Sequence, residues 1–110
     1  DLSVLALQGA VPKEGPSAGL AFAVGIISVL TQRPVRHDIA ITGEITLQGH
    51  ILGVGGVARK IAVARDAGAK AVIVPKENER EVGELPAQVH EGLRLIFVEK
   101  AEEAFREVFA

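Results

Sequence analysis

Cysteine is absent from the 110 residues of this sequence, and its absence excludes disulfide bonds, thiolate metal sites and a cysteine nucleophile. Any nucleophile in the chain must therefore be an oxygen or an amine. The lack of cysteine also fits a protein kept in a reducing compartment.

An excess of charge of one sign is missing as well. Twelve basic and fourteen acidic residues leave a formal net charge of −2, and no block of like charge occurs. The chain therefore lacks the positive surface that nucleic-acid binding requires. The longest apolar stretch, residues 18–30, is shorter than the roughly 18 residues of a membrane span, and no basic leader precedes it. We expect a soluble, cytoplasmic domain that binds neither membranes nor nucleic acids.

The composition that remains is that of a folded protein. Hydrophobic residues make up 48% of the chain and charged residues 24%, which is close to the average for soluble proteins. A chain of this length buries about 65% of its unfolded surface, and no linker or internal repeat divides it. We therefore expect residues 1–110 to belong to one domain.

Apolar segments of strand-like and helix-like spacing alternate along the chain. Residues 17–31 are apolar on nearly every face, which predicts a central helix enclosed by the rest of the domain. Gly68 is placed to end the helix predicted at residues 57–67. The alternation indicates the α/β (or α+β) class. The expected strands are residues 2–7, 39–42, 71–74 and 95–98 with a hairpin at 46–52, and the expected helices are 17–31, 57–67, 77–83 and 101–109.

Ser17 occupies the sequence GPSAG (residues 15–19), at the first turn of this apolar helix. The first N–H groups of a helix have no internal partners and carry the positive end of its dipole, so they stabilise an anion. Ser17 is therefore a candidate nucleophile, with the N–H groups of Ser17 and Ala18 as a candidate oxyanion hole. The small neighbours allow a peptide carbonyl to approach the hydroxyl. A serine that only caps the helix remains an alternative.

Lys60 lies one turn into the helix predicted at residues 57–67. Its neighbours three, four and seven residues later are Val63, Ala64 and Ala67, with no carboxylate among them. If this face is buried, desolvation disfavours the ammonium form, and a neutral amine can take a proton from a serine hydroxyl. The alternative is a surface lysine whose aliphatic stem covers apolar residues.

Thr42 and Glu44 stand at the end of the strand predicted at residues 39–42. The Thr42 hydroxyl is able either to accept a hydrogen bond from an ammonium or to donate one to a neutral amine. Glu44 either pairs with a cation or is solvated. An ordinary strand threonine is the alternative for Thr42.

Other sites receive little support from the sequence. The histidines His37, His50 and His90 fall in different segments without metal-ligand spacing, so we expect no metal site. The sequence GVGG at residues 53–56 matches neither the dinucleotide fingerprint nor a phosphate loop, which favours a plain tight turn over nucleotide binding. The charge run at residues 77–81 is typical of a solvated helix face.

Three blocks of the sequence together resemble the proteolytic domain of the Lon proteases. The blocks are PKEGPSAG at residues 12–19, TGEITL at 42–47 and GGVARK at 55–60. They occur in the family's order, and the resemblance covers almost the whole chain. The sequence resembles the bacterial type of Lon protease more than the archaeal membrane-bound type.

The resemblance implies a role for each candidate residue. Ser17 corresponds to the nucleophile, Lys60 to the amine that activates it and Thr42 to the threonine that orients the lysine, with Glu14 and Glu44 in supporting positions. It implies a serine endopeptidase with a Ser-Lys dyad, acting through an acyl-enzyme without metal or histidine. The implied fold is related to the second domain of ribosomal protein S5.

The resemblance also implies partners. The substrates would be unfolded or damaged polypeptides, and the assembly a homo-oligomer, usually a hexameric ring. No cofactor is expected in this domain, because ATP and Mg would be bound only by an ATPase module outside these residues in the full-length protein. Since the family's domain normally begins before Asp1, we interpret residues 1–110 as its C-terminal part.

The sequence departs from the family pattern at three positions. Glu14 replaces the more usual aspartate, and Ser3 and Leu5 stand where bacterial relatives commonly carry histidines, so no accessory histidine is available. The alternative function is a catalytically silent Lon-like assembly scaffold. The presence of both Ser17 and Lys60 favours the enzyme.

Overall fold

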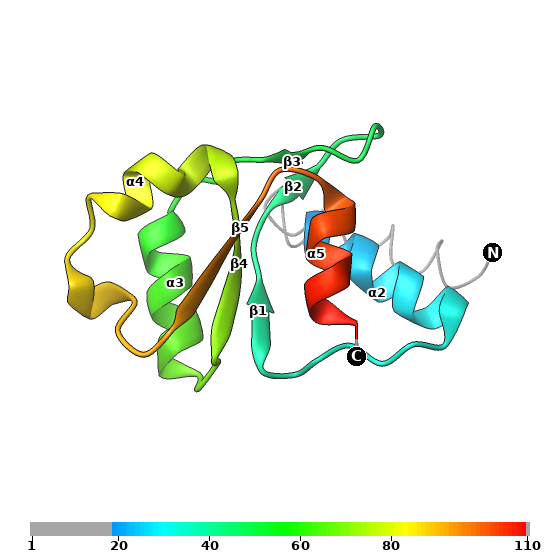
Figure 1. Cartoon of the computed structure of the whole chain (residues 1–110), viewed down its shortest axis with the longest axis horizontal. Helices are drawn as coiled ribbons and strands as arrows, with labels where there is room; N and C mark the ends of the chain where they lie inside the picture. The colour runs from blue at the N-terminus through cyan, green and yellow to red at the C-terminus, as the bar shows by residue number, and fades with distance from the viewer. Residues whose placement is uncertain (1–18, 110) are drawn as a thin grey trace.

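The computed structural model describes residues 19–109 of the chain, in which helices alternate with strands (Figure 1). The mixed fold class is therefore confirmed. The strand predicted at residues 2–7 and the first two residues of the helix predicted at 17–31 lie outside the described residues. The elements are α2 (Gly19–Thr31), β1 (Ile39–Ile41), β2 (Glu44–Ile45), β3 (Ile51–Leu52), α3 (Val57–Asp66), β4 (Ala71–Pro75), α4 (Glu79–Gly83), β5 (Arg94–Val98) and α5 (Ala101–Val108), with short 3₁₀ turns at Lys76–Asn78 and Ala87–Val89.

A parallel sheet with the strand order β1-β4-β5 lies at the centre of the described residues. Ala71 of β4 pairs with Ile39 on one side and with Arg94 on the other. Every residue of β4 is buried, and its β-branched run Val72-Ile73-Val74 suits a strand that is covered on both faces. The strands predicted at residues 39–42, 71–74 and 95–98 are confirmed to within one residue at each end.

The two faces of β4 belong to two hydrophobic clusters, because successive side chains of a strand point to opposite sides. Ile73 packs with α2 and α5, whereas Val72 and Val74 pack with α3. Figure 1 shows α3 on one side of the sheet and α5 on the other. Each fully buried valine or isoleucine stabilises the fold by about 1.5–3 kcal/mol relative to an exposed one. The central strand therefore connects α2 and α5 to the helix that carries Lys60.

The expectation that α2 is enclosed on nearly every face is wrong for the described residues. Leu20 and Val24 are buried, but Val29 and Leu30 are 52% and 54% exposed. The buried pair is spaced four residues apart, so one stripe of the helix faces the core and the rest lies at the surface. Composition alone misled here, because a uniformly apolar helix shows no preferred face. No helix within residues 19–109 is long and apolar enough to cross a membrane.

The predicted hairpin is confirmed, but its first strand begins two residues earlier than expected. β2 pairs with β3 in antiparallel register, with Ile45 opposite Ile51. Thr46 closes the turn instead of extending the strand, because its hydroxyl accepts the N–H of His50 at 3.1 Å and its carbonyl accepts the N–H of Gly49 at 2.9 Å. Gly49 has a φ of 86°, which a glycine adopts without strain.

The predicted helix at residues 57–67 is confirmed as α3. Gly68 follows it with a φ of 87° and donates its N–H to the Arg65 carbonyl, and Ala69 donates to the Ala64 carbonyl. This pair of bonds satisfies the last carbonyls of the helix, as expected for a glycine at this position. The helices predicted at 77–83 and 101–109 are also present, the first of them beginning as a 3₁₀ turn.

Candidate active site

Lys60 is the fourth residue of α3, which begins directly after a left-handed glycine. Gly56 has a φ of 66°, and its carbonyl accepts the backbone N–H of Lys60 at 3.1 Å. Val57, Ile61 and Ala64 are the buried residues of the helix and fix it against the sheet. Lys60 stands beside this buried stripe and is half-buried. The glycine turn and the buried stripe together set the direction in which Lys60 leaves the helix.

A groove with a volume of about 780 Å³ runs beside Lys60. Residues from α2, from the end of β1 and from α3 line it, and we call it the Lys60 groove. Val63 in its wall is 59% exposed, so the described residues do not provide the burial of this face on which the neutral amine was predicted to depend. The lining residues are Ala21, Ala40, Ile41, Thr42, Gly56, Arg59, Lys60, Val63, Ala64 and Ala67.

Thr42 lines the same groove directly after β1 and is only 6% exposed. Its hydroxyl donates to the Ile73 carbonyl at 2.7 Å, and its backbone N–H donates to the same carbonyl at 3.0 Å. Because the hydroxyl proton is engaged by Ile73, the oxygen retains only its lone pairs. Of the two alternatives drawn from the sequence, Thr42 can therefore accept a hydrogen bond from the nitrogen of Lys60 but cannot at the same time donate one to it.

The start of α2 packs closely against the segment that follows Thr42. The N–H of Leu20 donates to the Gly43 carbonyl at 2.9 Å, and a Cβ atom on Gly19 would lie 3.3 Å from the backbone nitrogen of Ile45. Gly43 has a φ of 138°, and a Cβ atom there would lie 3.0 Å from the Cγ2 atom of Ile51. Glycines are therefore required where the first turn of α2 meets the hairpin.

Of the remaining predicted site residues, only Glu44 lies within the described part of the chain. Glu44 begins β2, is half-buried and forms no ion pair with any of residues 19–109. Ser17, Ala18 and Glu14 lie outside the described residues, so the structure brings together Lys60 and Thr42 only. The pairing of Ser17 with Lys60 remains a prediction.

Comparison with known proteins identifies the family. The model of the Lon protease (S16) C-terminal proteolytic domain matches residues 1–110. The chain belongs to this family. It is 50% identical over 103 residues to the Lon protease of Dictyoglomus thermophilum, which covers 94% of this chain and 13% of that protein. The Lon protease of Clostridioides difficile is 46% identical over 107 residues, covering 97% of this chain and 14% of that protein. The chain thus spans about one seventh of the relatives it matches.

The glycine turn before α3 of this Lon-family chain is held by two side chains whose role the sequence did not reveal. Glu77 Oε1 accepts the N–H of Gly53 at 2.7 Å, and Asn78 Oδ1 accepts the N–H of Val54 at 2.9 Å. Asn78 Nδ2 donates to the Val54 carbonyl at 3.0 Å and to Glu81 Oε1 at 3.1 Å. We call Glu77 and Asn78 the turn clamp.

The turn clamp corrects the interpretation of residues 77–81 as a purely solvated run. Asn78 is only 5% exposed, and the signal that marks it is an amide that interrupts a series of charged residues directly after a buried strand.

The turn clamp also limits which ligands the glycine turn of this Lon-family domain can bind. The N–H groups of Gly53 and Val54 are already bonded, so they are not available to a phosphate. Among residues 19–109, no three side chains of metal-ligand type gather.

Proposed function

We propose that this chain hydrolyses peptide bonds as a serine endopeptidase in which Ser17 is the nucleophile and Lys60 is the general base. The observation that carries the proposal is that Lys60 and Thr42, which are 18 positions apart in the sequence, line one groove beside the start of α2. Ser17 precedes Gly19 by two residues, and two steps of the chain span at most about 7.2 Å. Membership of the Lon family supports the same assignment.

The proposed reaction begins when neutral Lys60 takes the hydroxyl proton of Ser17 and the serine oxygen attacks the peptide carbonyl. The tetrahedral intermediate collapses to an acyl-enzyme, and the Lys60 ammonium gives its proton to the leaving amine. Water then repeats the cycle and releases the carboxylic acid. Each proton that Lys60 takes up is returned, so the step requires neither a metal nor a histidine.

Thr42 and the first turn of α2 have supporting roles in this proposal. The lone pairs of the Thr42 hydroxyl accept an N–H of Lys60 and orient the amine, because the hydroxyl proton is held by Ile73. The N–H of Leu20 is bonded to Gly43 and is therefore not available to an oxyanion, so we assign that role to N–H groups that precede it in the chain. The N–H groups of Ser17 and Ala18 satisfy that condition. Glu14 and Glu44 flank the site in the sequence and complete the supporting set.

The context of the activity is part of the proposal. The relatives are named Lon proteases, and this chain matches only a small part of each. We propose that the domain acts on unfolded polypeptides in the cytoplasm within a homo-oligomeric ring, with ATP-dependent unfolding supplied by another module of the full-length protein.

Replacement of the two catalytic groups tests the proposal in the full-length protein. Ser17→Ala and Lys60→Met should each lower the rate of peptide cleavage by about 10³-fold or more, since each removes a group that participates in bond breaking. Lys70→Met is the matched control, because Lys70 is exposed and does not line the groove. Cleavage within tenfold of wild type in either catalytic variant would contradict the assignment. Assembly without any cleavage by the wild type would favour the scaffold alternative.

A further inference from the structure

The charged residues that line the Lys60 groove within the described part of the chain are both cations. They are Arg59 and Lys60, and the other lining residues are small, apolar or, for Thr42, neutral. No carboxylate of residues 19–109 lines the groove. A substrate that enters it therefore meets a positive surface that no neighbouring acid of residues 19–109 neutralises.

Arg59 is exposed and has no ion pair or side-chain hydrogen bond with any of residues 19–109. Other arginines of the same region are engaged. Arg65, six residues later on α3, bonds to Asp66 and to the backbone carbonyls of Gln88 and Val89. The guanidinium of Arg59 thus keeps its five N–H donors for a partner that the described residues do not supply.

The positions of Arg59 and Lys60 on α3 separate their tasks. Adjacent residues on a helix point about 100° apart, so the guanidinium and the amine reach different parts of the same groove. Lys60 has to be uncharged when it takes the serine proton, whereas a guanidinium stays charged at every working pH. Arg59 is then the lasting positive charge that a bound polypeptide encounters.

We propose that Arg59 is a specificity-determining residue that favours polypeptides with an aspartate or glutamate within about three residues of the cleaved bond. The inference rests on the proposed peptidase activity. An extended peptide advances about 3.3 Å per residue, so a side chain within three residues of the bond lies within reach of Arg59. Carboxylates suit a guanidinium because two parallel hydrogen bonds form in one plane. Lysine or arginine at the same substrate position is repelled.

The experiment uses the full-length protein and a set of matched peptides. Each peptide carries Glu, Gln or Lys at one of the three positions on either side of the cleaved bond, and kcat/KM is measured for each. At the position that faces Arg59, we expect the Glu peptide to be cleaved about two- to fivefold faster than the Gln peptide, with the Lys peptide slowest, as for an ion pair open to solvent. The preference should shrink when salt is raised from about 0.05 M to 0.5 M.

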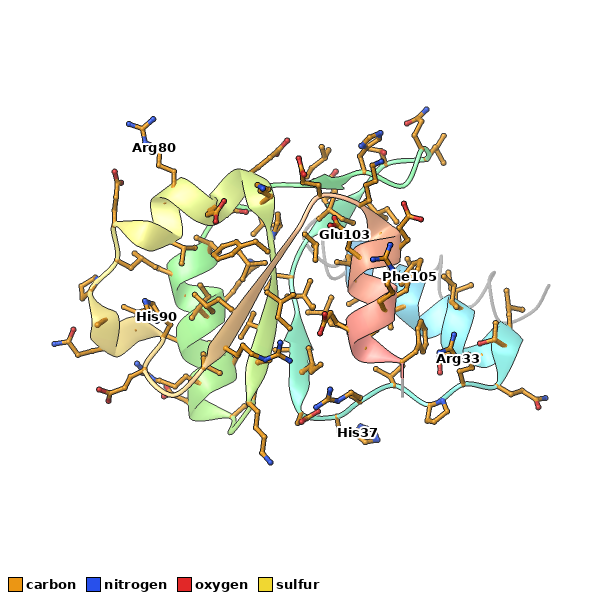
Figure 2. All side chains as sticks on the ribbon, viewed as in Figure 1. Arg33, His37, Arg80, His90, Glu103 and Phe105 are labelled. Carbon is orange, nitrogen blue, oxygen red and sulfur yellow. The ribbon has the colours of Figure 1, made fainter. Side chains whose placement is uncertain are left out.

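Variants separate the role of Arg59 from a general effect of charge. Arg59→Gln should remove the preference, so that the Glu and Gln peptides are cleaved at similar rates, and Arg59→Glu should reverse the order. Arg80→Gln is the control, because Figure 2 shows Arg80 projecting from α4, away from α3. It should retain the wild-type preference. Binding of the same peptides to the Ser17→Ala variant, measured by fluorescence anisotropy, should follow the same order without turnover.

Two results would overturn the inference while leaving the peptidase intact. One is cleavage that does not differ between Glu and Lys at any of the positions. The other is a preference for Glu that Arg59→Gln leaves unchanged. Failure of the wild type to cleave any peptide would instead contradict the proposed function itself.

Discussion

The turn clamp leads to a prediction whose size follows from its hydrogen bonds. Asn78→Ala removes two bonds to Val54 and one to Glu81, and it leaves the N–H and C=O of Val54 without those partners in a partly buried turn. At about 0.5–1.5 kcal/mol for each of the three bonds, the loss amounts to about 1.5–4.5 kcal/mol. For a domain of this size the midpoint of thermal unfolding should fall by roughly 10 °C or more.

The turn clamp should also affect chemistry, because the clamped turn leads directly into the helix that carries Lys60. We expect Asn78→Ala to lower peptide cleavage about ten- to a hundredfold, as for a base displaced by a fraction of an ångström to one ångström. Asn78→Asp retains an acceptor for the Val54 N–H but loses both donated bonds and faces the Glu81 carboxylate. Its loss of stability should therefore diminish at acidic pH, where the new carboxyl group becomes protonated.

Unfolding is best followed by far-ultraviolet circular dichroism, because the chain contains neither Trp nor Tyr. Arg80→Ala provides the control, since Arg80 is exposed on α4 and outside the turn clamp. A midpoint within about 2 °C of wild type for Asn78→Ala, together with unchanged cleavage, would refute the reasoning.

Three further predictions concern stability. Gly43→Ala should destabilise the fold by about 1–3 kcal/mol, because φ is 138° and the added Cβ atom meets Ile51 at 3.0 Å. Gly25→Ala should stabilise the fold by about 0.5–1 kcal/mol, because Gly25 lies in open space on α2. Changes of the same sign in the free energy of unfolding, measured by urea titration, would contradict this pair of predictions. Ile73→Ala should cost about 2–5 kcal/mol by the same assay, since the side chain is fully buried in β4. The N–H groups of Glu99 and Lys100 donate to Glu103 and lower the pKa of its carboxyl group. The stability that the Glu103 carboxylate adds is therefore complete above the ordinary pKa of a glutamate and is lost as pH falls through the lowered pKa. Glu103→Gln should be less stable than wild type near pH 7 and about equally stable in strong acid.

Figure 2 shows Glu103 at the start of α5, facing the turn before it. Nothing in the spacing of the sequence identified this bond, because a glutamate in the first turn of a helix is common whether or not it reaches back to the preceding N–H groups.

The parallel strands β1, β4 and β5 and the helix α3 were predictable from the sequence because their signals are local. The run Val72-Ile73-Val74 before a proline, and a helix closed by Gly68, each fix one short segment by its own residues. Lys60 and Thr42 line one groove, and the roles that the family resemblance implies for them stay predictions. The exposure of α2 was not predictable, because it depends on which neighbours cover a helix that is apolar all round.

The turn clamp and the direction in which the Thr42 hydroxyl donates its proton could not be predicted from the sequence, for a different reason. Both depend on contacts between segments more than twenty residues apart, and such contacts leave no periodic pattern. A buried amide within a charged stretch was the one visible sign of the clamp. For Thr42, the sequence left two hydrogen-bonding roles open, and only the distance to the Ile73 carbonyl distinguished them.

The two hydrogen bonds that converge on the Ile73 carbonyl interrupt any proton wire that would run from the groove through Thr42 into the interior. A hydroxyl whose hydrogen is donated to a backbone carbonyl does not pass a proton on, so Thr42 offers the groove no path for protons into the interior. Serine at this position would rotate more freely, so its hydroxyl proton would not stay on the Ile73 carbonyl. Valine would keep the shape of the side chain but lose the hydrogen bond to Ile73.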